Sequence, residues 1–169
     1  MELIGLLLIA TIYGIYFYYW FRALRISAPF YPTNKKTINT MLSELSKHDV
    51  KNVAELGAGD GRVAVALAKK GYEVSAIEFN PILILFIYLR KYLGGYKKLH
   101  VVRKNFLDVD YHEFDAAFIY LYPKVMDKLA KKLYKEMPNG SILISNTFAF
   151  HDKKPFKQAE NKIIIYRVE

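Results

Sequence analysis

The sequence predicts an α/β fold with an open, mostly parallel β-sheet, preceded by an N-terminal transmembrane helix. Three observations lead to this prediction. A glycine-rich turn joins a strand pattern to a helix pattern at residues 53–67, strands and helices alternate after it, and residues 3–21 carry no charge. Alternating strands and helices are typical of a parallel sheet covered by helices. The chain therefore divides into a membrane anchor at residues 1–25 and one domain at residues 26–169.

The uncharged N-terminal segment has the length and flanks of a membrane span. Its 19 residues would form a helix roughly 28 Å long, which matches a hydrocarbon core. Aromatic residues fill positions 16–21, and Arg22 and Arg25 follow, an order typical of an interface on the cytoplasmic side. A buried core helix is the alternative, but such a helix rarely lacks a polar face. We expect a single-pass anchor with the domain in the cytoplasm.

Composition limits the chemistry and suggests an anionic partner. The 169 residues include no cysteine, which excludes disulfides, thiolate metal sites and a cysteine nucleophile. The formal net charge is +9, much of it in Lys-Lys pairs. Each pair alone is typical of a solvated surface, whereas together they favour membrane lipids or nucleic acid. The predicted anchor favours the membrane.

A linker and a helix precede the glycine-rich turn. Ser27–Thr33 contains two prolines, which restrict the residues before them and predict an extended segment. Apolar residues from Ile38 to Leu45 then recur with helical spacing. The first strand is expected at residues 51–56.

The glycine-rich turn predicts a ligand site. Gly57, Gly59 and Gly61 lack a Cβ atom, so the backbone can adopt positive φ angles and a ligand can lie against it. The dinucleotide fingerprint would need a third glycine at position 62, where the chain has Arg62. Glu55, just before the turn, suits a ligand with an ammonium group and is a poor neighbour for a pyrophosphate.

The later elements complete the sheet. Strands are expected at 73–78, 99–103, 115–121 and 141–146, and helices at about 62–70, 82–93 and 123–135. The 11 residues between the third and fourth strands are too few for a helical crossover. An irregular stretch is therefore expected at 105–111. The pattern of residues 156–168 predicts two short strands in this segment.

Polar and aromatic residues follow the predicted strands, where open parallel sheets bind ligands. Glu78 ends the second strand and suits a ribose diol. The alternative is an ordinary carboxylate on the surface, which its position after the glycine-rich turn disfavours. Asn105 and Phe106 follow the third strand, and either border an adenine or form a simple turn. Tyr120 and Tyr122 follow the fourth strand.

Three of these segments resemble motifs I, II and III of the class I S-adenosylmethionine (SAM) methyltransferases. They are Glu55–Arg62, Ile77–Pro81 and Asn105–Asp110. The resemblance implies a Rossmann-like sheet that is mostly parallel, with an antiparallel C-terminal strand, and SAM as the cofactor.

Further segments resemble one protein-lysine methyltransferase family, which includes the ATP synthase c-subunit lysine methyltransferase and archaeal protein-lysine methyltransferases. They are Ala28–Thr33, Tyr120–Pro123 and Ile144–Phe148. The resemblance covers about residues 29–168. Asn105 departs from the more usual Asp of motif III, and Tyr122 from a common leucine.

The resemblance implies a role for each matching residue. Tyr120 and Tyr122 would line the lysine channel, and Tyr31, with Pro32 and Thr33, would close over the cofactor; the three tyrosines would be the catalytic residues. The cofactor-binding residues would be Glu55, Gly57, Ala58, Gly59, Gly61, Glu78, Phe79, Asn105, Phe106, Pro32 and Thr33.

We therefore predict a membrane-anchored, SAM-dependent protein-lysine N-methyltransferase acting on a lysine of a membrane protein. In-line methyl transfer needs mainly positioning and desolvation. A lysine amine, with a pKa near about 10.4 in water, must also lose its proton, which an apolar channel favours. The alternatives are a methyltransferase for a small molecule or a lipid headgroup, and a non-catalytic SAM-binding membrane module.

Other chemistry has little support in the sequence. His112 and His151 suit surface positions better than a general base, and the histidines and acids show no metal-ligand spacing. Nucleic acid is disfavoured as a substrate by the anchor and by the absence of an Asn/Asp-Pro-Pro-Tyr/Phe sequence after the fourth strand. The basic charge alone would suit RNA.

Overall fold

A single sheet organises the protein, in a computed structural model that describes residues 2–26 and 31–169. Within these residues it has seven strands in the order β3-β2-β1-β4-β5-β7-β6. Strands β1 to β5 run parallel, and β7 pairs antiparallel with both β5 and β6. This confirms the predicted sheet with its antiparallel C-terminal strand. The strands are β1 (Asn52–Leu56), β2 (Glu73–Glu78), β3 (Leu99–Arg103), β4 (Ala116–Ile119), β5 (Ile142–Asn146), β6 (Lys157–Ala159) and β7 (Ile163–Arg167).

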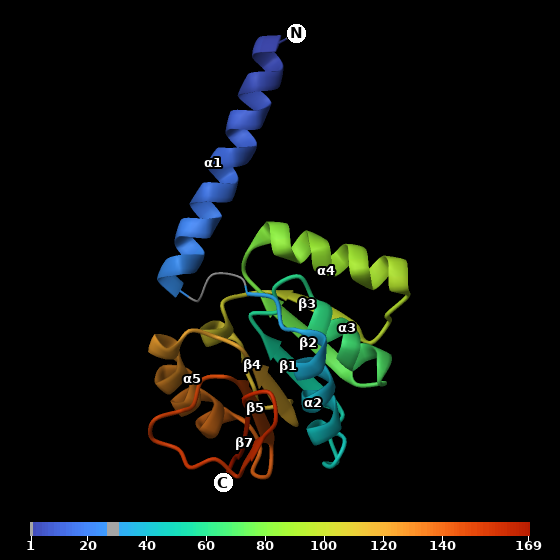
Figure 1. Ribbon diagram of the computed structural model, residues 1–169, viewed down its shortest axis with the longest axis vertical. Coiled ribbons are helices and arrows are strands. Elements are labelled where there is room, and N and C mark those ends of the chain that lie inside the picture. Colours follow the sequence, from blue (N-terminus) through green and yellow to red (C-terminus); the bar gives the residue numbers. More distant parts are fainter. Residues whose placement is uncertain (1, 27–30) are drawn as a thin grey trace.

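Helices cover both faces of the sheet (Figure 1). Met41, Leu67 and Ile87 bury the inner sides of α2, α3 and α4 in the core on one face. Met126 and Leu133 bury α5 in the core on the other face. Burial of each such side chain stabilises the fold by about 1.5–3 kcal/mol. The helices are α1 (Glu2–Ile26), α2 (Lys35–Leu45), α3 (Arg62–Lys69), α4 (Pro81–Gly94) and α5 (Pro123–Glu136).

The helix ends follow from local sequence. The Asn34 side chain accepts a hydrogen bond from the Thr37 N–H (2.9 Å) and begins α2. Asn80 caps α4 in the same way, with Pro81 at the first helical position. Gly95 ends α4 with φ +66°, a left-handed conformation that glycine adopts readily. These caps fix where α4 begins, directly after β2.

The β3–β4 connection is irregular, as predicted. It contains a short 3₁₀ helix, Phe106–Asp108. The Tyr111 side chain is fully buried beneath it, and its hydroxyl donates to the Phe106 carbonyl at 2.6 Å. Burial raises the pKa of Tyr111. This stretch and α5 together cover the second face of the sheet.

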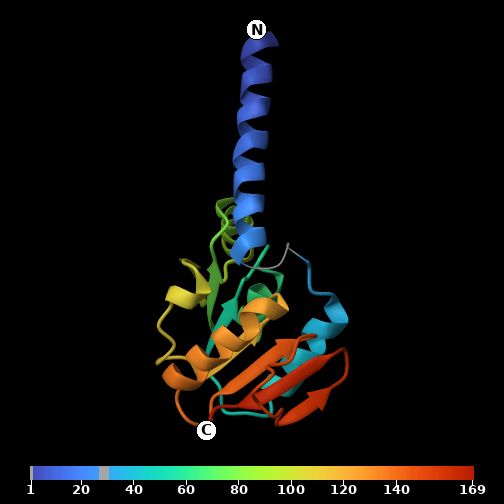
Figure 2. The ribbon, with the colours of Figure 1, turned by 90° about the vertical axis from the view of Figure 1, so that its left-hand side faces the viewer.

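The N-terminal helix α1 extends away from the domain in both views (Figures 1 and 2). Its apolar side chains, including Leu6 and Ile9, are exposed. Among residues 2–26 and 31–169, no helix is both long and apolar enough to cross a membrane. The transmembrane helix predicted over residues 1–25 is therefore not supported. That prediction counted uncharged residues, which include four tyrosines with polar hydroxyls between residues 13 and 19. Residues 27–30 of the predicted linker lie outside the described residues.

Candidate active site

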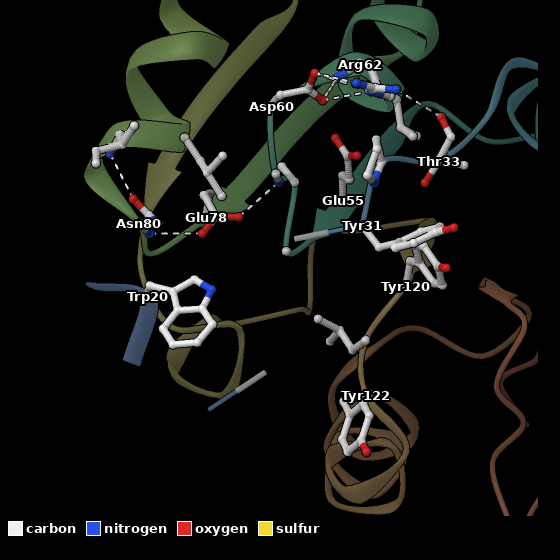
Figure 3. A pocket seen from close by; sticks show the side chains of 18 of the residues that line it. Trp20, Tyr31, Thr33, Glu55, Asp60, Arg62, Glu78, Asn80, Tyr120 and Tyr122 are labelled. Atoms are coloured by element: carbon white, nitrogen blue, oxygen red, sulfur yellow. Dashed lines mark hydrogen bonds and ion pairs between the residues drawn. The ribbon is translucent and has the colours of Figure 1, made fainter. Parts of the chain in front are cut away.

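A pocket of about 370 Å³ lies at the carboxyl ends of β1, β2 and β4 (Figure 3). The parallel sheet brings these strand ends together, and β1 lies between β2 and β4. Most of the site residues predicted from the sequence line it. They are Tyr31, Pro32, Thr33, Glu55, Gly57, Ala58, Gly59, Glu78, Tyr120 and Tyr122.

The glycine-rich turn forms the floor of the pocket. The N–H groups of Gly57 and Ala58 donate to the Ile77 carbonyl of β2, at 2.9 and 3.0 Å. Gly57 has φ +71°, and a Cβ atom there would lie 2.9 Å from Cδ2 of Leu121. The turn therefore favours glycine at this position for its backbone conformation, and a Cβ atom would also displace the end of the Leu121 side chain.

Replacing Gly57 by alanine should cost more stability than the same change at Gly140. Both glycines have positive φ, but nothing lies within 4 Å of a Cβ built at Gly140. The left-handed conformation alone costs about 1–2 kcal/mol, so Gly140→Ala measures that cost. We expect Gly57→Ala to lower the free energy of unfolding by roughly 1–2 kcal/mol more, because of overpacking. Chemical denaturation of both variants tests this; equal losses would show that Leu121 does not confine the turn.

Glu55 is a buried carboxyl group with one oxygen left unpaired. The residue is 3% exposed, and its Oε2 atom has no hydrogen-bond partner. Burial raises the pKa of Glu55 well above its ordinary value, and the nearby Asp60 and Glu78 raise it further, although a hydrogen bond from the Ala64 N–H opposes them. An unpaired buried oxygen is costly, so this atom is suited to a cationic ligand group.

Glu78 forms the side of the pocket at the end of β2. Its Oε2 accepts a hydrogen bond from the Gly59 N–H (2.9 Å), and its Oε1 accepts from the N–H groups of Phe79 and Asn80 (2.8 and 2.9 Å). Desolvation raises the pKa of Glu78, although these three bonds oppose the shift. The bonds hold the carboxyl group in one orientation, and Oε2, which accepts only one of them, keeps a lone pair for a ligand hydroxyl.

Asp60 and Arg62 tie the turn to neighbouring segments. The Asp60 carboxylate pairs with Arg62 (2.9 Å) and with Arg90 of α4 (2.7 Å). Desolvation of Asp60 opposes ionisation, but the two arginines outweigh it and lower the pKa of the carboxyl group. Arg62 also reaches the Thr33 carbonyl at 3.5 Å. The segment before α2 is thereby held over the turn.

Aromatic rings form the opposite wall. The Tyr31 ring meets the Tyr120 ring edge-on, with centroids 6.5 Å apart, and the Phe148 ring stacks on Tyr120 with centroids also 6.5 Å apart. Burial raises the pKa of the Tyr120 hydroxyl. Tyr122 lies at the exposed rim, with the Lys124 ammonium 6.0 Å from its ring. In Figure 3, Tyr31 and Tyr120 lie together on the side away from Trp20 and Glu78.

A strained residue positions Phe148. Thr147, just after β5, has φ +73°, which is rare for a β-branched residue. Its N–H donates to the Lys162 carbonyl (2.8 Å), and its hydroxyl donates to the Asn146 side chain (3.0 Å). Such strain persists only where the surroundings enforce it. Here the reversal of the chain directs Phe148 back to Tyr120.

Some predicted residues do not line the pocket. Gly61 caps α3, where a Cβ would lie 3.0 Å from Ile87 of α4, so it allows these helices to pack closely. Asn105 accepts a hydrogen bond from the Leu107 N–H (3.0 Å) and caps the 3₁₀ helix. Phe106 is buried. The roles of Phe79, Asn105 and Phe106 in cofactor binding stay predictions.

The pocket also includes residues that the sequence reasoning missed. Phe148 lies in a segment noted for its resemblance, but nothing in the sequence placed its ring. Tyr16 and Trp20 come from α1, whose apolar pattern pointed only to a membrane. The further lining residues are Asp60, Arg62, Val63, Asn80, Ile82, Leu83 and Leu121.

The predicted surface histidines lie outside the pocket. His112 is exposed and contacts Asp110, and the exposed His151 pairs with Asp127 at 3.1 Å. In the described part of the chain, no group of three or more His, Asp or Glu side chains is arranged to hold a metal ion.

Comparison with known proteins identifies the family. The ANTKMT methyltransferase domain matches residues 55–157, which is more than half of the chain. The chain belongs to this methyltransferase family. A protein-lysine N-methyltransferase of Saccharolobus islandicus is 30% identical over 137 residues, covering 75% of this chain and 81% of its own. The mouse ATP synthase c-subunit lysine N-methyltransferase is 28% identical over 145 residues, covering 83% of this chain but 57% of its own.

A solved structure shows the same fold. The RNA methyltransferase of Salinibacter ruber, in complex with S-adenosyl-L-homocysteine, aligns with a TM-score of 0.75 and 22% identity, over 82% of this chain and 94% of its own. At this identity the likeness concerns the fold alone.

Membership of the methyltransferase family makes SAM the cofactor, and the pocket fits it. The SAM ammonium group matches the unpaired Oε2 of Glu55. Its methionine part needs a floor without side chains, which Gly57 provides, and its ribose hydroxyls match the fixed carboxyl group of Glu78. A polar ligand is held best where each buried group finds a partner.

Proposed function

We propose that the protein is a SAM-dependent protein-lysine N-methyltransferase. The observation that carries this proposal is that the unpaired Glu55 carboxyl and the Tyr31–Tyr120–Phe148 aromatic wall line one pocket. The first group suits the cofactor, and the second suits a lysine side chain. The relatives named above are lysine methyltransferases. The chain spans little more than half the length of the mouse relative.

The residues of the pocket would position and desolvate the reactants. SAM, when bound, supplies an electrophilic methyl group on a sulfonium. Glu55 and Glu78 would hold the cofactor, and the aromatic wall would border an apolar path for the lysine side chain. In that path the neutral form of a lysine amine is favoured, because burial disfavours the charged form. Tyr120 can accept a hydrogen bond from the amine, and its ring can contact a methylated ammonium. Positioning of the amine against the methyl group would supply the remaining rate acceleration.

Radiolabelled SAM separates this proposal from its alternatives. The full chain is incubated with isolated membranes of its source organism, and label is counted in protein, lipid and small-molecule fractions. We expect label in protein, and none with Glu55→Ala. Label in lipid or small molecules would instead indicate the headgroup or small-molecule methyltransferase. Cofactor binding without any transfer would indicate a non-catalytic SAM-binding module.

We also propose that the enzyme works at a membrane, on a lysine of a membrane protein, with its catalytic domain in the cytoplasm. The exposed apolar side chains of α1 and the net charge of +9 support this location, because anionic lipids attract basic proteins. Fractionation of cells at low ionic strength tests it. The protein should be recovered with the membranes; recovery in the soluble fraction would contradict the location.

A further inference from the structure

The outer face of α4 is apolar although the helix is already packed. Ile84 and Ile87 are buried and fix the inner side of α4, which contacts β2 and β3. The opposite side exposes Leu85, Leu89 and Leu93, together with Phe86 and Tyr92. These positions follow the spacing i, i+1, i+4, i+7 and i+8, which places them on one face of a helix. Leu93 is 87% exposed and Tyr92 is 73% exposed. We define these five residues as the α4 outer face.

We infer that the α4 outer face docks on an anionic lipid bilayer and so sets the orientation of the pocket toward the membrane. Helix α4 lies at the same end of the domain as α1 in both views (Figures 1 and 2). Scattered exposed apolar residues need no explanation, but a contiguous apolar face marks an interaction site.

The environment of α1 points to lipid as the occupant. The consecutive residues Leu6, Leu7, Leu8 and Ile9 are each 55–64% exposed. Because successive helical residues point about 100° apart, these four side chains face every direction around the axis. Such a surface needs a covering partner on more than one side, and the net charge of +9 favours an anionic lipid surface for this role. The α4 outer face lies at the same end of the molecule (Figures 1 and 2).

The charges beside the α4 outer face favour anionic headgroups. Helix α4 carries no acidic residue, and the exposed Lys97 and Lys98 follow its last turn. Arg90 pairs with Asp60, and Lys91 lies on the inner side of the helix, four residues after the buried Ile87. Exposed lysines beside an apolar helix face attract anionic headgroups. Tyr88 and Tyr92 stack with ring centroids 6.0 Å apart, and tyrosine is enriched at that depth.

Docking in this way would place the pocket beside the headgroups. Ile82 and Leu83, in the first turn of α4, line the pocket together with Trp20 of α1. The outer face begins with Leu85 on the same helix. A lysine near a membrane surface would then reach the aromatic wall without the domain detaching from the bilayer.

A single fluorescent label tests the docking. The chain has no cysteine, so Leu89→Cys gives one labelling site in the full chain, and Leu93→Cys a second on the same face. With the environment-sensitive dye NBD, both labels should shift to the blue on vesicles containing phosphatidylglycerol and be quenched by spin-labelled lipids. Phe156→Cys is the matched control: Phe156 is also exposed, and it precedes β6, at the opposite end of the domain from α4.

The outcomes are distinct. Labels at positions 89 and 93 that stay in water while the protein floats with the vesicles would overturn the inference and indicate a protein partner for this face. Equal shifts on phosphatidylcholine vesicles would overturn the requirement for anionic lipid. The measurement uses neither SAM nor a methyl acceptor, so its failure is independent of any failure of the proposed function.

Discussion

Glu55→Gln should abolish tight cofactor binding without weakening the fold. The variant keeps the shape of the side chain but loses the charge that would pair with the ammonium group. Loss of one partner of a buried, hydrogen-bonded charge pair costs about 2–5 kcal/mol, so the dissociation constant for S-adenosylhomocysteine should rise roughly 100-fold. Glu55 is buried with an unpaired oxygen, so the neutral amide should unfold at the same temperature or a higher one.

Calorimetry and thermal unfolding on the same protein samples check both parts. Glu73→Gln is the matched control, because Glu73 lies outside the pocket and pairs with Lys98 and His100. The Glu73→Gln variant should change neither the dissociation constant nor the unfolding temperature. A Glu55→Gln variant that binds as tightly as the parent would remove the basis of the cofactor assignment.

The raised pKa of Glu55 gives this binding a defined pH dependence. Burial raises the pKa in the free protein, whereas a bound ammonium group favours the carboxylate and lowers the pKa again. Affinity for S-adenosylhomocysteine should therefore rise as the pH increases from the ordinary value of 4.5 to the raised value, with proton release on binding. Over the same window the free protein should lose stability, because its native state holds more protons than its unfolded state. The pH dependence of the affinity and that of the stability should both flatten in Glu55→Gln. If they are unchanged in this variant, another titrating group causes them.

Tyr120→Ala should slow methyl transfer strongly while cofactor binding stays. Tyr120 contacts both Tyr31 and Phe148, so its removal opens the aromatic wall to water. The lysine amine then keeps its proton and loses its alignment, and a misplacement of about 1 Å costs on the order of 100-fold in rate. We expect kcat to fall by about that factor, with the dissociation constant for S-adenosylhomocysteine changed less than about threefold.

Two further variants define what Tyr120 contributes. Tyr120→Phe keeps the ring stack and should retain most of the activity if desolvation matters more than the hydroxyl group. Tyr96→Ala is a control for loss of a packed tyrosine, since Tyr96 packs on the core outside the pocket. It should lower stability with kcat unchanged. A Tyr120→Ala enzyme with normal kcat would place the lysine path elsewhere.

Much of the sheet could be predicted from short apolar runs and their boundaries. Strands β2 and β3 have the predicted bounds, because each is a half-buried run between turn residues. Strand β4 is shorter than the predicted 115–121, since its pairing stops at Ile119 and the chain turns out of the sheet to place Tyr120 and Tyr122 at the pocket. The expectation that ligands bind beyond the carboxyl ends of parallel strands therefore located the site, although the predicted length of β4 was wrong.

The remaining features depend on tertiary contacts that no local pattern reports. Phe148 reaches the pocket because Thr147 adopts a left-handed conformation, which its residue type disfavours. Trp20 lines the pocket because of how α1 lies beside the domain. A count of uncharged residues over α1 predicted a membrane span that the structure does not support. The fixed orientation of Glu78 depends on backbone N–H groups from two segments, which sequence spacing could not show.

Mass spectrometry of transferred methyl groups is the decisive test of lysine methylation in this pocket. The full chain is incubated with trideuteromethyl SAM and membranes, beside the Tyr120→Ala variant, and the proteins are digested and sequenced. We expect deuterated methyl groups on the side-chain nitrogen of lysine, present with the parent chain and absent with the variant. Deuterium only in lipids, nucleic acid or small molecules, or on lysines equally with both chains, would contradict the proposed function.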